Sequence, residues 1–184
     1  GVCRDHYHAH TSGITLRFSR ERIALIYEYY ETGHLAIGRV DRFGDYCQLL
    51  TPQRTLECQF QSLKNAHRLL QNGWGLYLGE LEEQAAELAG TVKLEPVKVR
   101  FFSPVMEFIR EGDCRHRQQK LKLGPKNETG QIEYIDYIVP LPRRSFKEFL
   151  LWVYRYMNNA IVLSPPELVQ QHRQAARDLV ARWE

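Results

Sequence analysis

Arginines close to a tyrosine are the residues of the first half best suited to binding an anionic ligand. Arg39, Arg42 and Arg54 lie on either side of Tyr46. A guanidinium offers a planar fork of donors that fits a phosphate, and an aromatic ring offers a face on which a base stacks. These four residues are predicted to bind such a ligand, and the alternative is an ordinary solvated surface.

A second basic group begins at Arg115 and includes His116, Arg117 and Lys120. Side chains alternate between the two faces of a strand, so Arg115 and Arg117 would share one face while His116 and Lys120 share the other. We predict that these four residues and Arg100 contact nucleic acid. An exposed strand without a role is the alternative interpretation of such a charged run.

No residue pattern predicts catalysis, a metal site or a cofactor. His6, His8 and His10 alternate as zinc ligands on a strand would, but no fourth ligand accompanies them. Asp41 and Asp45 are not spaced as a catalytic pair. A Ser-His-Asp order, a glycine-rich phosphate loop and an HExxH motif are all missing from the sequence. We therefore expect a protein that is not an enzyme and that has no catalytic residue, metal or cofactor.

Composition sets only broad bounds on function. The 184 residues allow one large domain or two small ones, and 43% of them are hydrophobic, which is enough for a core. The net charge of +3 permits an anionic partner without requiring one. No apolar run is long enough to span a membrane, and no secretory signal opens the chain. The four cysteines form no CxxC pair, so a cytoplasmic protein with free thiols and no membrane partner is predicted.

The elements that would position these residues differ between the two halves. Regularly spaced short strands in the first half predict a small barrel or a meander, followed by two helices. The expected strands are 14–18, 23–29, 34–40, 46–50 and 55–60, and the expected helices are 62–70 and 80–88.

The second half has a strand–helix–strand–strand–helix–strand order followed by a closing helix. Its expected strands are 97–102, 115–123, 131–139 and 160–163. Helix starts are predicted at Ser103-Pro104, at a capping box from Ser145 to Glu148, and at a second box from Ser164 to Glu167. This order is typical of a ferredoxin-like module. The fold class is thus α+β, with domains at 1–95 and 96–184.

Two segments of the second half resemble the C-terminal extension of bacterial WYL-domain regulators. They read KVRFFSPVMEFI and IVLSPPELVQQHRQAARDLVARW. By the same resemblance, the first half is similar to the WYL core, a small Sm-like barrel. Tyr46 then falls on the family's W-Y-L strand. Gln59 and Gln61 fall on its F-R-L-D-R-I strand, although both arginines and the aspartate are missing, and they join the implied ligand-binding set.

The resemblance implies the ligand-sensing and oligomerisation portion of a WYL-type transcriptional regulator. The implied ligand is a nucleotide or single-stranded nucleic acid, and the implied assembly is a homodimer. DNA would be bound by an N-terminal winged helix absent from this chain, because no helix-turn-helix pattern precedes Ile14. The segments GRVDRFGDYCQLLTPQRTL and RHRQQKL also resemble a branch associated with CRISPR loci, which implies a link with CRISPR or phage defence.

Two other functions stay open at this point. One is a CRISPR-type endoribonuclease with a ferredoxin-like fold, which would need a general base such as His34 or His116 but lacks that family's glycine-rich loop. The other is a non-catalytic dimerisation scaffold, which the missing arginines favour. The closing helix bears on dimerisation, because its apolar stripe is wider than one packed face requires. The seam comprises Leu168, Ala175, Leu179 and Trp183, and the residues that widen it are Val169, Ala176 and Val180.

Overall fold

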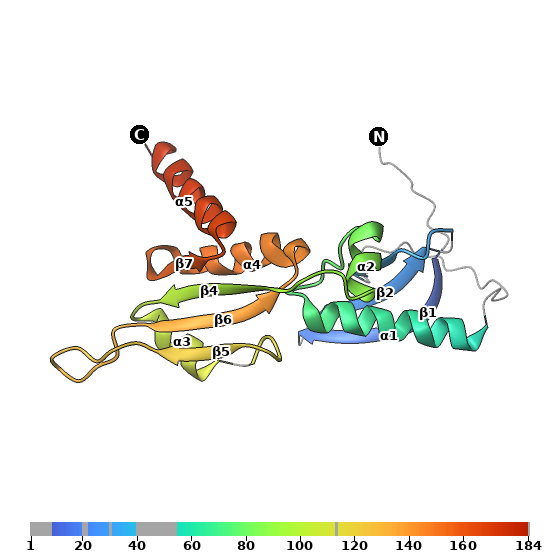
Figure 1. Ribbon diagram of the computed structural model, residues 1–184, viewed down its shortest axis with the longest axis horizontal. Helices are drawn as coiled ribbons and strands as arrows, with labels where there is room; N and C mark the ends of the chain where they lie inside the picture. Colours follow the sequence, from blue (N-terminus) through green and yellow to red (C-terminus); the bar gives the residue numbers. More distant parts are fainter. Residues whose placement is uncertain (1–8, 20–21, 30, 40–54, 113, 184) are drawn as a thin grey trace. The chain divides into compact units, whose positions relative to one another are not determined.

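A computed structural model describes residues 9–19, 22–29, 31–39, 55–112 and 114–183. The chain divides into two compact units, residues 1–92 and 93–184. Each unit combines helices with an antiparallel sheet (Figure 1), which confirms a mixed α and β fold. None of the described helices is long and apolar enough to cross a membrane.

The first unit pairs a three-stranded sheet, in the order β1-β2-β3, with two helices. Its strands are β1 (Ala9–Ser19), β2 (Arg22–Tyr29) and β3 (Leu35–Arg39), and its helices are α1 (Leu56–Asn72) and α2 (Leu81–Leu88). A turn joins β2 and β3 between the strands predicted at 23–29 and 34–40: Gly33 adopts a φ of +72°, which glycine tolerates best, and Tyr29 N donates to His34 O at 2.9 Å.

The predicted strand at 55–60 is wrong, because these residues open helix α1. Thr55 has extended backbone angles, and its Oγ1 accepts a hydrogen bond from Cys58 N at 3.3 Å, so it is the N-cap. Leucine, glutamate and glutamine in the first turns are good helix formers, and they extend the helix upstream of the predicted start. Within the described residues no sheet closes into a barrel, and the predicted strand at 46–50 lies outside them.

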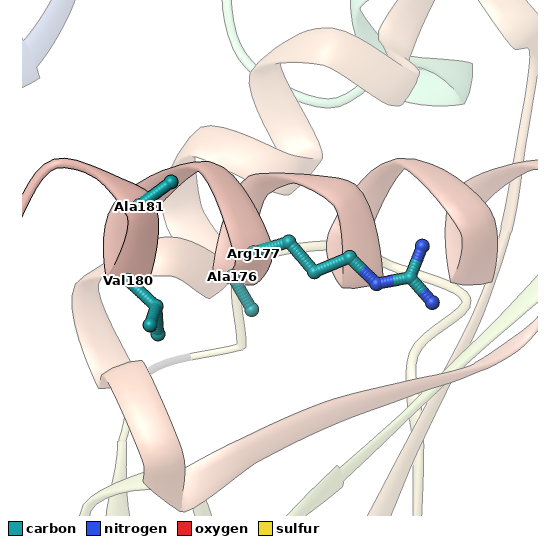
Figure 2. A pocket seen from close by; sticks show the side chains of 4 residues that line it. All are labelled: Ala176, Arg177, Val180 and Ala181. Carbon is teal, nitrogen blue, oxygen red and sulfur yellow. The ribbon is translucent and has the colours of Figure 1, made fainter. Parts of the chain in front are cut away.

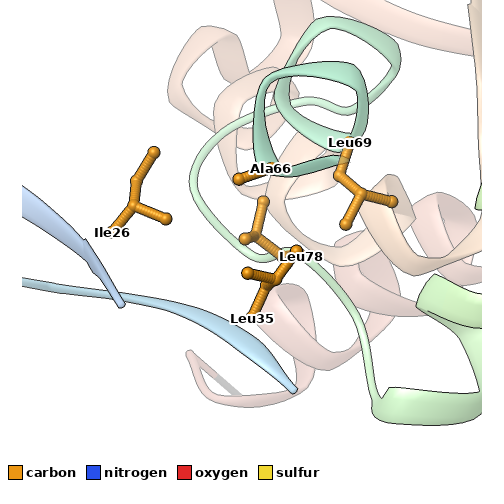
Figure 3. Packing of buried hydrophobic residues seen from close by; sticks show 5 residues of the cluster. All are labelled: Ile26, Leu35, Ala66, Leu69 and Leu78. Carbon is orange, nitrogen blue, oxygen red and sulfur yellow. The ribbon is translucent and has the colours of Figure 1, made fainter. Parts of the chain in front are cut away.

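The core of the first unit lies between its sheet and α1. Figure 3 shows Ile26 and Leu35 from the strands facing Ala66 and Leu69 from α1, with Leu78 between them. All five side chains are buried. The helix therefore packs on one face of the sheet through residues spaced three apart, as an amphipathic helix does.

The second unit contains a four-stranded sheet with the order β5-β6-β4-β7, in which all neighbours are antiparallel. Its strands are β4 (Glu95–Phe101), β5 (Lys120–Leu123), β6 (Ile135–Leu141) and β7 (Ala160–Ser164). Its α-helices are α3 (Val105–Glu111), α4 (Phe146–Val153) and α5 (Pro166–Ala181), and two 3-10 helices, η2 (Arg143–Ser145) and η3 (Tyr154–Asn159), flank α4.

One face of the second sheet packs on α4. Val97, Val99 and Phe101 are fully buried and alternate with less buried residues along β4. The rings of Phe101 and Tyr137 lie 5.5 and 5.4 Å from the Trp152 ring of α4, at angles that favour aromatic contact. This covered face leaves the alternate residues of the same strands on the opposite face.

Two strands of the second unit begin later than predicted. The strand expected at 131–139 is β6, which begins at Ile135. The strand expected at 115–123 begins only at Lys120, because residues 115–119 form a turn. In that turn the Oε1 of Gln119 accepts hydrogen bonds from Arg115 N at 2.9 Å and His116 N at 3.1 Å. A single side chain thus satisfies two backbone donors that a strand would have paired with its neighbour.

None of the predicted serine caps in the second unit makes a side-chain cap hydrogen bond. Helix α3 begins after Pro104 instead of at Ser103, and Ser145 has helical backbone angles. Ser164 belongs to β7, where its Oγ donates to Pro96 O at 3.1 Å. The predicted proline in the first turn of the last helix is confirmed, because α5 begins at Pro166.

The apolar seam of α5 packs only at the N-terminal end of the helix. Leu168 is fully buried, whereas 58% of Val180 and 84% of Trp183 are exposed. Figure 1 shows α5 leaving the end of β7 with its C-terminal turns clear of the sheet of its own unit. The apolar seam is therefore buried at its start and exposed along the second half of the helix.

Candidate ligand-binding surface

The face of the second sheet opposite α4 carries most of its basic side chains, and we call it the open face. In antiparallel strands, directly paired residues share a face. Lys98 and Arg100 alternate with the buried residues of β4, so they lie on the open face. The residues of neighbouring strands that align with them across the sheet lie on the same face. The open face comprises Lys98 and Arg100 of β4, Lys120 and Lys122 of β5, Asp136 and Ile138 of β6, and Ile161 of β7.

The cations of the open face form two rows across the strands. The first row runs from Lys122 through Asp136 to Arg100, and the second runs from Lys120 through Ile138 to Lys98. Residues two apart on a strand are separated by about 7 Å, and neighbouring strands by about 5 Å. The four positive charges are therefore spread over a patch that suits a chain of repeated negative charges.

Asp136 lies between the two cations of β4 and binds both. Its Oδ1 and Oδ2 accept hydrogen bonds from Nε and Nη2 of Arg100 at 2.8 and 3.2 Å, and Lys98 Nζ lies 2.8 Å from Oδ2. The Asp136 side chain is 4% exposed, against 25% for Arg100 and 31% for Lys98. A carboxylate this buried is stable only because it is paired and hydrogen-bonded.

The ion pairs decide the protonation state of this cluster. Burial alone would raise the pKa of Asp136, but hydrogen bonds from Arg100 and Lys98, together with their charges, lower it overall. The hydrogen bond to Asp136 raises the pKa of Arg100. Asp136 and Arg100 are therefore charged at neutral pH, and the single carboxylate offsets one of the four positive charges of the open face.

Tyr134 adds an aromatic ring beside this cluster. The Cζ of Arg100 lies 3.5 Å from the centroid of the Tyr134 ring, which is close cation–π contact. On its other side the ring approaches the backbone of Gly124, where an added Cβ would lie 2.8 to 2.9 Å from three ring carbons. Gly124 is therefore required for close approach of the ring, since any larger residue would displace Tyr134.

Two of the predicted nucleic-acid-binding residues, Arg100 and Lys120, lie on the open face. The sequence interpretation missed Lys98, Lys122 and the anchoring residue Asp136. A signal was present, because lysines alternate with leucines in the sequence KLKL of β5 and basic residues alternate with apolar ones in β4. That alternation places the cations of each strand on one face.

The other three predicted residues of that set lie in the turn before β5, away from those strands. His116 is buried, and its Nδ1 accepts a hydrogen bond from Gln118 N at 3.2 Å. The Cζ of Arg115 lies 5.8 Å from the Trp152 ring of α4, on the covered side of the sheet. Arg117 is exposed in the same turn. The structure therefore does not bring Arg115 to the open face.

The predicted ligand-binding set of the first half is described only in part. Arg42, Tyr46 and Arg54 lie outside the described residues, and Arg39 is described only by its backbone at the end of β3. The two glutamines lie on helix α1 instead of a strand. Gln59 is partly buried, and Gln61 donates to Asn65 Oδ1 at 2.9 Å. The ligand site of this half stays a prediction.

The histidines considered as general bases are each engaged locally. His34 Nε2 lies 3.0 Å from Gly79 O, and its ring stacks on Tyr29 with centroids 5.6 Å apart. His116 is bonded within its turn, as described above. The absence of catalysis stays a prediction.

A shallow pocket lies on α5 and is lined by Ala176, Arg177, Val180 and Ala181 (Figure 2). Ala176 and Val180 point to the same side, while the Arg177 side chain runs along the helix. All four lining residues come from one helix, so this is a surface hollow, and it lacks the opposing walls that enclose small ligands.

The second unit matches a known domain family. Residues 93–180 match the family model of the WCX domain, the WYL C-terminal extension. The match covers just under half of the chain, and it is consistent with the C-terminal part of a WYL-type regulator. No curated protein matches the chain. The match does not test a link with CRISPR loci, which stays a prediction.

Proposed function

We propose that this chain is the ligand-sensing and oligomerisation portion of a WYL-type transcriptional regulator. In this proposal a nucleotide or single-stranded nucleic acid binds the open face of the second sheet through its phosphates. The observation that carries the proposal is the pair of cation rows formed by Lys98, Arg100, Lys120 and Lys122. Such contacts supply much of the affinity of nucleic-acid-binding proteins.

A ferredoxin-like topology of the second unit belongs to the same proposal. It is supported by the order of strands and helices along the chain, and by the sheet order β5-β6-β4-β7, which puts the first and third strands of the unit at the centre. With one face of the sheet against α4, the opposite face is the surface on which a ligand can lie.

The wider role rests on the family and on the resemblance in sequence. In a WYL-type regulator, we propose that this chain forms a homodimer and that a winged helix in the same regulator binds DNA. A role in CRISPR or phage defence is supported only by the resemblance of two segments. Ligand binding to the open face would then be the signal that alters DNA binding.

Fluorescence anisotropy with the full chain and a labelled single-stranded oligonucleotide tests the ligand proposal. Replacing both lysines of β5, Lys120→Gln with Lys122→Gln, should weaken binding roughly tenfold at low salt. The slope of log Kd against log salt between about 50 and 200 mM should fall by about 1.4, because each lost contact with a single strand removes about 0.7.

The control replaces two exposed cations elsewhere in the same unit, Lys147→Gln on α4 with Arg173→Gln on α5. It lowers the net charge equally, so general electrostatic attraction falls by the same amount. Its affinity should stay close to that of the wild type. An equal loss in both double variants would assign binding to net charge, and no binding by the wild type at low salt would reject the proposal.

A further inference from the structure

The guanidinium of Arg100 is fixed in orientation by two different contacts. Its edge donates to both oxygens of Asp136, and Tyr134 lies against one of its faces. Because Asp136 is almost fully buried in the sheet, the edge contact holds the plane of the guanidinium in place. A quarter of the Arg100 side chain, 25%, nevertheless stays exposed.

The ring of Tyr134 is itself supported from below. The three ring carbons nearest to the added Cβ of Gly124 lie at almost equal distances, 2.8, 2.8 and 2.9 Å. Near-equal distances to adjacent carbons place Gly124 under the ring face instead of at its edge. Gly124, Tyr134 and Arg100 therefore form successive layers, with the guanidinium outermost.

The same contacts leave Arg100 only one free donor fork for a phosphate. A bidentate phosphate contact needs the donor fork of the guanidinium, and Asp136 already occupies one such fork. The face of the guanidinium opposite Tyr134 is not used by any contact that the structure describes. Arginine planes and aromatic rings are the surfaces on which single-stranded bases stack.

We propose that the outer face of Arg100 is a stacking site for one nucleobase of the ligand, while Lys98, Lys120 and Lys122 contact its phosphates. The inference rests on the proposed function and deepens it, because it divides the open face between recognition of a base and recognition of the phosphate backbone. Tyr134 and Asp136 act as positioning residues, since they hold the guanidinium plane and do not contact the base.

The experiment compares two labelled oligomers of equal length, oligo-dT and the same backbone without bases. With the full chain, the wild type should bind oligo-dT roughly tenfold more tightly than the abasic oligomer, because one stacked base accounts for a difference of that size. Arg100→Lys keeps the charge and an amine to pair with Asp136 but has no plane. Its ratio of the two affinities should fall close to one.

Two further variants separate stacking from charge and from misfolding. Gly124→Ala displaces the Tyr134 ring without changing any charge, and it should also lower the ratio. Lys147→Gln, on the exposed surface of α4, should leave the ratio at the wild-type value. Urea denaturation of each variant shows whether it is folded.

The outcomes distinguish this inference from the proposed function. Equal binding of both oligomers by the wild type would overturn base stacking and leave phosphate binding by the open face intact. A wild-type ratio that persists in Arg100→Lys would also overturn it, because another residue would then read the base. Binding of neither oligomer would reject both the inference and the proposed function.

Discussion

Asp136 organises the cations of the open face around a single buried carboxylate. Two cations bind it at once, and both keep part of their surface in water. The carboxylate therefore gives up hydration that the cations retain, and the pairing compensates for this loss only while both partners are present. The role of Asp136 on the open face is therefore structural: it holds two of the cations in place.

We expect Asp136→Asn to destabilise the protein by about 1–3 kcal/mol at neutral pH. The variant keeps the side-chain shape but leaves Lys98 and Arg100 without a counter-charge. The value lies below that of a fully buried pair, because both cations are partly solvated. Urea denaturation measures the change. Asp178→Asn, on the exposed surface of α5, is the control and should change stability by less than about 0.5 kcal/mol.

The same carboxylate should give the protein a defined dependence on acid. The folded pKa of Asp136 is lowered, so its stabilisation is complete above the unfolded value of about 3.9. It is lost as the pH falls through the folded pKa. Between about pH 5 and pH 2 the wild type should therefore lose more stability than Asp136→Asn. Parallel losses would show that Asp136 does not titrate as its contacts require.

At the residue scale, the sequence predicts charges but not their partners. Arg100 and Lys120 were identified because basic residues are visible in any sequence. Asp136 and Tyr134 were not, because their roles depend on cross-strand pairing with residues far away in the chain. Gly124 lies between two predicted strands and had no predicted role, whereas its requirement comes from the ring that lies against it.

At the scale of elements, strongly periodic segments were predicted well and helix ends were not. Strands β2 and β4 coincide closely with expectation, and in β4 the alternation matches burial of one face, whereas β1 begins five residues before the predicted strand. The serine caps failed where backbone geometry overrode composition: Ser145 has helical angles, and Ser164 extends a strand. Thr55, which is the N-cap of α1, was predicted to begin a strand.

His172 of helix α5 contacts the backbone of β7, and this contact should make the stability of the protein depend on pH. His172 Nε2 lies 3.2 Å from Ala160 O, and its ring stacks on Tyr154 with centroids 5.7 Å apart. Its buried Nδ1 has no hydrogen-bond partner within the described residues. Burial lowers the pKa of His172, although the hydrogen bond to Ala160 opposes the change.

The lowered pKa of His172 predicts a loss of stability in mild acid. An unfolded histidine has a pKa of about 6.5, so below this pH the unfolded chain binds a proton that the folded chain does not. Stability should therefore be complete above about pH 6.5 and fall as the pH drops toward the folded pKa. Urea denaturation at about pH 5 and pH 8 measures the difference.

A pair of glutamine variants assigns this dependence to one residue. His172→Gln retains a donor for Ala160 O but does not titrate, so the loss of stability in acid should be smaller than in the wild type. His67→Gln, at an exposed position of α1, should keep the wild-type dependence. If both variants behave alike, α5 is not the pH-sensitive element.

At the scale of the whole molecule, the net charge of the chain does not reveal the concentration of cations on the open face. The chain carries 25 basic and 22 acidic side chains, so its overall charge of +3 does not demand an anionic partner. On the open face, four cations, Lys98, Arg100, Lys120 and Lys122, surround one carboxylate, and the difference is again +3. The remaining charges of the chain cancel, 21 basic against 21 acidic, so a charge map of the folded unit is more informative than the composition.

The last turns of α5 should associate with a second copy of the chain. Ala176 and Val180 lie one turn apart on α5, Trp183 follows in the turn beyond its end and donates its backbone N–H to Val180 O at 2.9 Å, and all three residues are exposed. Figure 2 shows the hollow beside Ala176 and Val180, which suits a large side chain such as a second copy's tryptophan. In a two-fold contact each copy supplies both the hollow and the ring, so the surface is self-complementary.

Light scattering should give a dimer for the wild type and a monomer for Val180→Glu. Gln170→Glu adds the same charge to the same helix away from the stripe and should stay dimeric. A monomeric wild type at high concentration, or a dimeric Val180→Glu variant, would show that α5 is not the interface.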